Sequence, residues 1–159
     1  MSDLRIGIGV DAHGFSGATR LVLGGVELDG PGLAGHSDGD VIAHALIDAL
    51  LGAANLGDIG SLFPPTEETP AGTSSLELLR DAYGRVRASG YELVNADCIL
   101  IGERPRIADR RAEMARRLSD ALDVDANRIT VRATTTDGLG FAGRGEGLAA
   151  QAVALLRRS

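Results

Sequence analysis

Bulky apolar residues and small residues alternate along the first part of the chain. Ile6, Ile8 and Val10 occupy every second position, and Gly7 and Gly9 lie between them. A period of two is typical of a β-strand, whose successive side chains point to opposite faces. Because one face of this strand is nearly bare, we expect another element to approach it closely.

Two short apolar runs around a pair of glycines predict a hairpin. Residues 21–23 and 26–28 are mostly apolar, and Gly24 and Gly25 between them supply the positive φ that a tight turn needs. Longer strands are expected at 91–101 and 129–135, where β-branched and other apolar residues are frequent.

Four further stretches have the pattern of helices. The first runs from a cap at Ser37 or Asp38 to about residue 54. The second begins at Ser74, which has capping-box spacing to Glu77, and ends near residue 89. A charged surface helix is expected at 109–122, and the Ala, Leu and Val series at 148–156 predicts a final helix. About four or five strands mixed with four helices indicate an α/β protein.

The segment at residues 57–73 has no periodicity and holds three of the five prolines. Compact domains keep loops of this length mainly for function. We therefore interpret the segment as a mobile lid.

Composition narrows the classes of function. The 159 residues are 44% hydrophobic, which is enough for a single domain over residues 1–159. The 22 acidic residues outnumber the 16 basic ones, and only 3% of the chain is aromatic. A nucleic-acid-binding protein needs basic patches and stacking rings, so we expect no nucleic-acid partner.

The chain also predicts no membrane partner. The most apolar stretch, residues 41–56, is interrupted by polar residues and is shorter than the ~20 apolar residues that span a bilayer. The start, Met1 to Leu4, has no cationic segment followed by an apolar one, so no targeting peptide is expected. The single cysteine, Cys98, has apolar neighbours and is expected to be a packed thiol in a cytoplasmic protein.

All three histidines fall within 32 positions. Asp11 and His13 are two residues apart at the end of a predicted strand, so their side chains leave the same face. His44, from the first predicted helix, would complete a site of two imidazoles and one carboxylate. Three such ligands leave a fourth tetrahedral position open, as in catalytic zinc sites. The alternative is that these are ordinary polar loop and surface residues.

Two other segments have the composition of phosphate sites. Residues 36–40 place a histidine, a serine and two aspartates at a helix N-terminus, where free N–H groups favour anions. Residues 134–140 end a strand with three threonines, an aspartate and two glycines, which can hold a diphosphate. The alternatives are helix caps in the first segment and a flexible turn in the second.

Four motifs together resemble the 2-C-methyl-D-erythritol 2,4-cyclodiphosphate synthase family. They are residues 7–13, residues 35–41 with His44, residues 56–60, and residues 133–136 continuing to 143–147. The resemblance covers essentially the whole chain in order. It implies a two-layer sandwich of a small mixed sheet and helices, and a homotrimer with active sites at the subunit interfaces.

The resemblance also implies the reaction and its residues. The family converts 4-diphosphocytidyl-2-C-methyl-D-erythritol 2-phosphate into the cyclic 2,4-diphosphate and CMP, in the non-mevalonate route to isoprenoids. By similarity, one zinc per subunit is held by Asp11, His13 and His44, while His36 and Thr135 assist the transition state. The methylerythritol phosphate part of the substrate is expected to contact Asp11, His13, His36, Ser37, Asp58, Ile59, Gly60, Phe63 and Glu67. The cytidine diphosphate part is expected to contact Gly102, Arg106, Ala133, Thr134, Thr135 and Asp137.

The chain departs from the common family pattern at three places. Arg106 stands where a lysine is usual, which keeps the charge but alters its reach. Pro65 replaces a frequent aspartate, and the neighbouring Glu67 and Glu68 are possible substitutes. Asp137 stands where many members carry a glutamate for a second divalent ion, magnesium or manganese, bound with the diphosphate.

The resemblance further places the glycine-rich turn at 143–147 on the trimer axis. Phe141 and Arg144 would there line a cavity for a diphosphate with an apolar tail, such as a downstream isoprenoid diphosphate. The alternative is that Arg144 and Glu146 only lock the trimer. For the whole chain, the alternatives to a synthase are a metal-dependent phosphoesterase and a non-catalytic binding module.

Overall fold

A computed structural model of the chain describes residues 3–17 and 19–159. Met1 and Ser2, on which the expected absence of a targeting peptide partly rests, lie outside the described residues. A five-stranded mixed sheet has the order β4-β1-β7-β5-β6. Its strands are β1 (Leu4–Ser16), β4 (Gly32–Leu33), β5 (Tyr91–Ile101), β6 (Ile129–Thr134) and β7 (Gly147–Arg158). β5 and β6 run parallel, and the other pairs are antiparallel.

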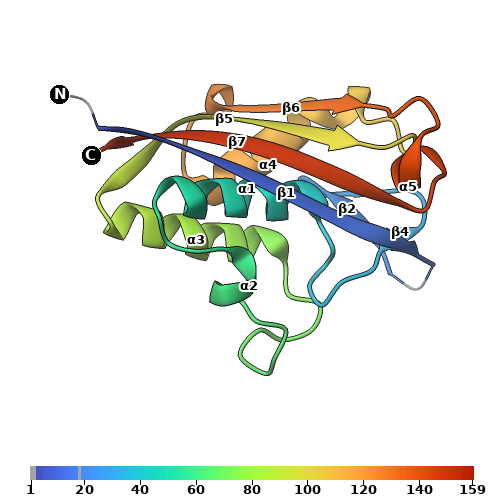
Figure 1. Ribbon diagram of the computed structural model, residues 1–159, viewed down its shortest axis with the longest axis horizontal. Coiled ribbons are helices and arrows are strands. Elements are labelled where there is room, and N and C mark those ends of the chain that lie inside the picture. Colours follow the sequence, from blue (N-terminus) through green and yellow to red (C-terminus); the bar gives the residue numbers. More distant parts are fainter. Residues whose placement is uncertain (1–2, 18) are drawn as a thin grey trace.

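The predicted hairpin is confirmed as a separate two-stranded sheet of β2 (Leu21–Leu23) and β3 (Val26–Leu28). The helices α1 (Val41–Ala53), α3 (Ser75–Ala88) and α4 (Arg111–Leu122) lie on one side of the five-stranded sheet (Figure 1). Two further helices are short, α2 (Ile59–Leu62) and α5 (Gly140–Gly143). α2 lies within the predicted loop at 57–73. The arrangement confirms a mixed sheet with helices.

The bare face of β1 is packed against α1, as the alternation predicts. A Cβ added to Gly7 would lie 2.0 Å from the backbone oxygen of Ala49, and one added to Gly9 would lie 1.9 Å from that of Ala45. Neither position has room for any side chain. The two glycines therefore let α1 lie directly on β1, and this contact fixes the distance between His44 and the end of β1.

The predicted final helix at 148–156 is wrong, because these residues form β7. β7 pairs with β1 on one side and β5 on the other, so it is a central strand of the sheet. Ala150, Ala152, Ala154 and Leu156 are buried at every second position, toward the helices. Alanine and leucine favour helices in isolation, but here the two flanking strands supply the hydrogen bonds and the small side chains admit α1.

The predicted helix caps also differ from the observed ones. Asp40, and not Ser37 or Asp38, caps α1 by accepting the N–H of Ala43. Ser74 precedes α3 but its side chain makes no capping hydrogen bond, so the capping box is not formed. Instead the carboxylate of Asp38 accepts the N–H of Ser75 at 3.0 Å. A side chain from a distant loop thus caps α3, which local spacing does not reveal.

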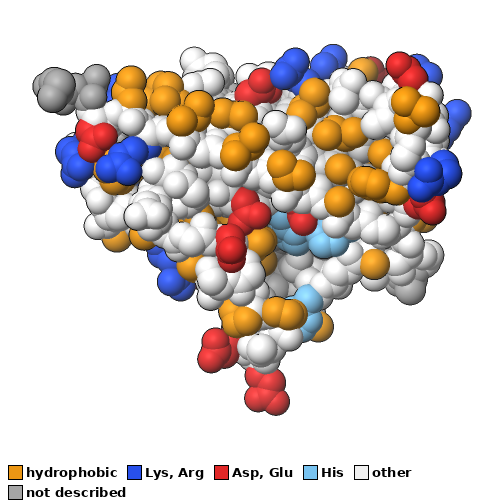
Figure 2. Space-filling model, in the orientation of Figure 1, with side chains coloured by type: hydrophobic (Ala, Val, Ile, Leu, Met, Phe, Trp, Pro, Cys, Tyr) orange, Lys and Arg blue, Asp and Glu red, His pale blue; other side chains and the backbone are white. Residues whose placement is uncertain are grey.

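The side of β1 that faces away from the helices is apolar and exposed. Ile6, Ile8 and Val10 are each at least 60% exposed, and Leu4 is 53% exposed. Figure 2 shows apolar side chains along the sheet, above the pale blue histidines. Soluble monomers rarely leave a contiguous apolar face of this kind uncovered, so it marks an interaction surface. Among the described residues, no helix is long and apolar enough to cross a membrane.

Candidate active site

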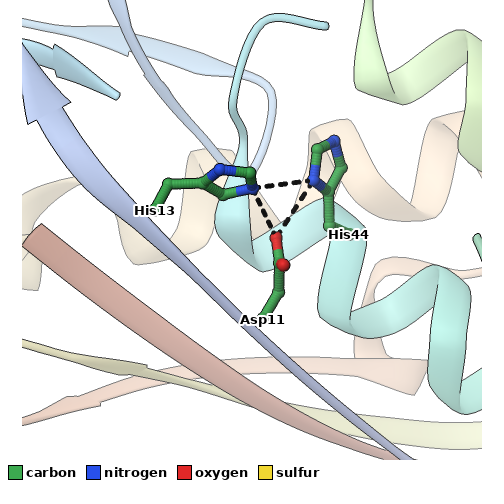
Figure 3. A group of neighbouring side chains, drawn as sticks. All are labelled: Asp11, His13 and His44. Atoms are coloured by element: carbon green, nitrogen blue, oxygen red, sulfur yellow. Dashed lines mark hydrogen bonds and ion pairs between the residues drawn. The ribbon is translucent and has the colours of Figure 1, made fainter. Parts of the chain in front are cut away.

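Three side chains from two elements converge at the end of β1 (Figure 3). Asp11 and His13 leave the same face of β1, and His44 comes from the second turn of α1. Asp11 Oδ2 lies 2.7 Å from His13 Nε2 and 3.0 Å from His44 Nδ1, and the two ring nitrogens are 3.2 Å apart. The convergence expected from the sequence is therefore confirmed.

The geometry of this triad fits a divalent metal ion. Four ligands placed tetrahedrally at about 2.0–2.1 Å from zinc lie about 3.3 Å from one another. The observed separations of 2.7–3.2 Å need only a slight opening to reach that value. Two imidazole nitrogens and one carboxylate oxygen also match the usual ligands of zinc, with one position left for a substrate oxygen.

The surroundings of Asp11 and His13 favour the charged form of each side chain. Burial alone would raise the pKa of Asp11, but its hydrogen bonds with His13 and His44 outweigh burial and lower that pKa to about 2. The hydrogen bond with Asp11 raises the pKa of His13, against the opposing effect of burial. A carboxylate that stays ionised is a ready metal ligand, and the metal competes with a proton for His13.

A second layer of polar side chains supports His44. Its Nε2 lies 2.8 Å from Ser75 Oγ and 3.0 Å from Ser37 Oγ. Ser75 Oγ in turn donates to Asp38. The sequence patterns missed Ser75, because it is 31 residues from His44 and only the neighbouring Ser74 carried a local signal.

A cavity of about 190 Å³ opens beside the triad. Besides the three ligands, its lining includes five expected site residues, His36, Ser37, Ile59, Gly60 and Phe63. His36 is exposed on the 35–40 turn, and its Nε2 contacts the backbone oxygen of Thr69. The structure therefore places His36 near the triad but not among the metal ligands.

Two residues expected at this site do not line the cavity. Asp58 caps α2, where its Oδ1 accepts the N–H of Ser61 at 2.8 Å. Glu67 is exposed further along the 57–73 segment. The sequence also missed Asp48, which accepts the N–H of Ile59 at 2.7 Å and so holds the 58–60 turn beside the cavity.

A separate cavity of about 350 Å³ lies where β5 and β6 end side by side. Five of the residues expected to contact cytidine diphosphate line it, Gly102, Arg106, Ala133, Thr134 and Thr135. Asp137 follows in an exposed turn and accepts a hydrogen bond from Thr135 Oγ1 at 3.3 Å. Within one chain, Thr135 and His36 therefore line different cavities.

The remaining expected residues lie at the same end of the sheet. Phe141 is 44% exposed, and Arg144 forms an ion pair with Glu146 at 2.8 Å. Arg144 also lines a larger cavity of about 720 Å³ together with Arg106. That cavity contains none of the triad residues, so size alone does not identify the reactive site.

Known proteins similar to this chain agree on one family. The YgbB family model matches residues 4–157. The chain is 52% identical to the 2-C-methyl-D-erythritol 2,4-cyclodiphosphate synthase of Rubrobacter xylanophilus, over 100% of this chain and 98% of that protein. It is 54% identical to the bifunctional enzyme IspD/IspF of an Anaeromyxobacter species, over 98% of this chain but 40% of the longer relative.

A solved structure extends this similarity to three dimensions. The CDP complex of IspF from Plasmodium falciparum matches the chain with a TM-score of 0.87 and 31% identity, over 100% of this chain and 99% of that one.

Proposed function

The chain belongs to the YgbB family, whose members include the 2-C-methyl-D-erythritol 2,4-cyclodiphosphate synthases, and we propose that it performs their reaction. The enzyme is a lyase that forms 2-C-methyl-D-erythritol 2,4-cyclodiphosphate and CMP from 4-diphosphocytidyl-2-C-methyl-D-erythritol 2-phosphate. An oxygen of the 2-phosphate bonds to the β-phosphorus. The bond from that phosphorus to the bridging oxygen breaks, and this oxygen leaves with CMP.

The observation that carries this proposal is the triad of Asp11, His13 and His44 in a cavity shared with His36. We assign the triad to one zinc ion per subunit. Bound there, zinc would supply a Lewis acid for a phosphate oxygen. Ser37 and the backbone of the 59–60 turn lie at the cavity wall, where they can orient the methylerythritol phosphate.

For an intramolecular attack, the enzyme must chiefly hold the substrate in a folded conformation, and a general base is less important. A well-oriented internal nucleophile lowers a barrier by about 7–11 kcal/mol relative to a bimolecular reaction. His36 lies within reach of this cavity and can donate a hydrogen bond to the charge that develops as the ring closes. We propose that Thr135 also assists the transition state, from the cavity that is expected to hold the cytidine diphosphate.

We further propose a homotrimer with active sites at the subunit interfaces. The apolar outer face of β1 supports an interface between copies of the chain. The separation of the His36 and Thr135 cavities within one chain supports a site shared by two copies. Sedimentation tests the trimer directly, and a monomer that turns over substrate at the full rate would contradict it.

Two additional ligands are part of the proposal. A second divalent ion, magnesium or manganese, would bind with the diphosphate near Asp137, whose carboxylate faces the Thr135 turn. A diphosphate with an apolar tail would bind near Phe141 and Arg144 at the trimer axis. In an Arg144→Ala variant, lost diphosphate binding with an intact trimer favours this ligand site, whereas dissociation favours a role in locking the trimer.

Mass analysis of the products tests the reaction. Zinc-loaded enzyme and the cytidine substrate should give CMP and a cyclic diphosphate whose masses sum to that of the substrate. A product heavier by one water would instead indicate a phosphoesterase, and absence of CMP would indicate a binding module.

The one cysteine of the chain, Cys98, is free and buried, which supports a cytoplasmic location.

A further inference from the structure

His44 has two ring nitrogens, and only one can serve the metal. Nδ1 faces the triad, while Nε2 faces Ser75 and Ser37. In a neutral imidazole one nitrogen carries the proton and the other carries a lone pair. A metal ligand must present the lone pair, so the site requires the proton of His44 to be on Nε2.

The proton positions around Ser75 decide this question. The carboxylate of Asp38 accepts the N–H of Asp40 at 3.1 Å and the N–H of Ser75 at 3.0 Å. Both donors are backbone amides, so neither hydrogen bond can reverse direction. The same carboxylate also contacts the hydroxyl of Ser75. Because a carboxylate only accepts, the single hydroxyl proton of Ser75 points to Asp38.

Ser75 Oγ can then only accept from His44. Its contact with Nε2 is 2.8 Å, and Ser75 is fully buried, so water does not compete for the hydroxyl. The proton of His44 must lie on Nε2 to make this hydrogen bond. Nδ1 lies 3.0 Å from Asp11 Oδ2 and 3.2 Å from His13 Nε2, so a metal held by those two atoms takes the place of any proton on Nδ1 and meets its lone pair.

We propose that Ser75, anchored by Asp38, is a positioning residue that fixes the His44 tautomer and thereby makes Nδ1 a metal ligand. This inference rests on the proposed function, because it assumes a metal at the triad. The side chain of His13 is hydrogen-bonded to the backbone of Ala34, and no side-chain substitution at position 34 removes that partner. The nitrogen of His44 that faces away from the triad has only side-chain partners, so its orientation can be tested by substitution. Such supporting hydrogen bonds are typically worth 10–100-fold in metal affinity.

The first test is zinc affinity, measured by competition with a chromogenic chelator. Ser75→Ala should bind zinc about 10–100-fold more weakly than the unmodified protein. Ser75→Thr keeps the hydroxyl and should restore most of the affinity. Ser74→Ala is the matched control, because the neighbouring Ser74 makes no side-chain capping bond, and it should bind zinc normally. Unchanged affinity in Ser75→Ala would overturn the proposal.

The second test reads the tautomer itself in the metal-free protein. Long-range ¹H–¹⁵N correlation spectra in mildly alkaline buffer should show the proton of His44 on Nε2. In Ser75→Ala the signal should shift toward a mixture of tautomers, a change that a purely structural role would not produce. An Nε2 without a proton in the unmodified protein would refute the inference even if zinc binds, and this measurement does not depend on any variant folding.

The two tests separate this inference from the proposed function. If the unmodified protein binds no zinc, the proposed metal site fails while the tautomer result still stands. Asp38→Ala provides an independent variant, since it removes the carboxylate that holds the Ser75 hydroxyl proton away from His44. It should lower the share of His44 that carries a proton on Nε2 and weaken zinc binding, and an unchanged Nε2 proton with normal affinity would contradict the relay.

Discussion

Gly9→Ala should disturb the fold and the metal site together. A Cβ at position 9 would lie 1.9 Å from the backbone oxygen of Ala45, where ordinary contact begins at 3.4 Å. α1 must therefore move away from β1 by about 1.5 Å, because a backbone oxygen within a helix cannot turn aside. Overpacking of this kind costs about 1–3 kcal/mol, which lowers the melting temperature of a chain this size by about 2–12 °C.

The same displacement acts directly on the triad. Asp11 follows position 9 by two residues on β1, and His44 precedes Ala45 on α1. Metal–ligand distances tolerate about 0.2 Å of change, so a shift of about 1.5 Å should weaken zinc binding by at least ~10-fold. Thermal unfolding of the metal-free protein measures the stability effect, and chelator competition measures the affinity.

Gly52→Ala is the matched control for this experiment. Gly52 lies on α1, and an added Cβ there would be 4.0 Å from the nearest atom, the backbone oxygen of Ile8. Alanine should fit and stabilise the helix by about 0.5–1 kcal/mol without changing zinc affinity. If Gly9→Ala had the same melting temperature and zinc affinity as the unmodified protein, the contact at Gly9 would not set the distance between β1 and α1 in the metal site.

Three further outcomes are expected. His44→Ala should lose zinc and turnover together, and full zinc occupancy by elemental analysis would refute its role as a ligand. His36→Ala should keep zinc but slow cyclisation by on the order of 10²–10³, and unchanged turnover at saturating substrate would exclude it from the transition state. Burial raises the pKa of Cys98 to about 12, so the folded protein should resist thiol alkylation in mildly alkaline buffer. Rapid alkylation without unfolding would contradict the burial of this thiol. Because the pKa of Cys98 in the folded protein lies above that of an unfolded thiol, its contribution to the free energy of unfolding should fall as pH rises from about 9 toward 12.

The sequence predicts those parts of the fold whose signal is local. The strand at 91–101 is confirmed at both ends, because apolar residues and β-branched residues coincide there. The period of β1 correctly placed Asp11 and His13 on one face. The bare glycine positions also correctly indicated a close neighbour, although only the structure identifies it as α1.

The features that the sequence did not predict depend on distant contacts. β7 has the composition of a helix and becomes a strand because β1 and β5 enclose it. The contact between Asp38 and Ser75 joins residues 37 positions apart, and no local pattern encodes it. The shared lining of the triad cavity likewise arises only when the 57–73 segment folds back over α1.

The central place of β7 has a consequence for synthesis of the chain. β1 is made first, yet its long antiparallel partner spans residues 147–158, so the sheet cannot close until these residues have left the ribosome. Until then the nascent chain holds β1 and β5 apart, each with an unpaired edge. Pairings between such distant segments form slowly, and open strand edges invite association with other chains. The growing chain is therefore most in need of chaperone protection in the interval just before β7 is inserted between β1 and β5.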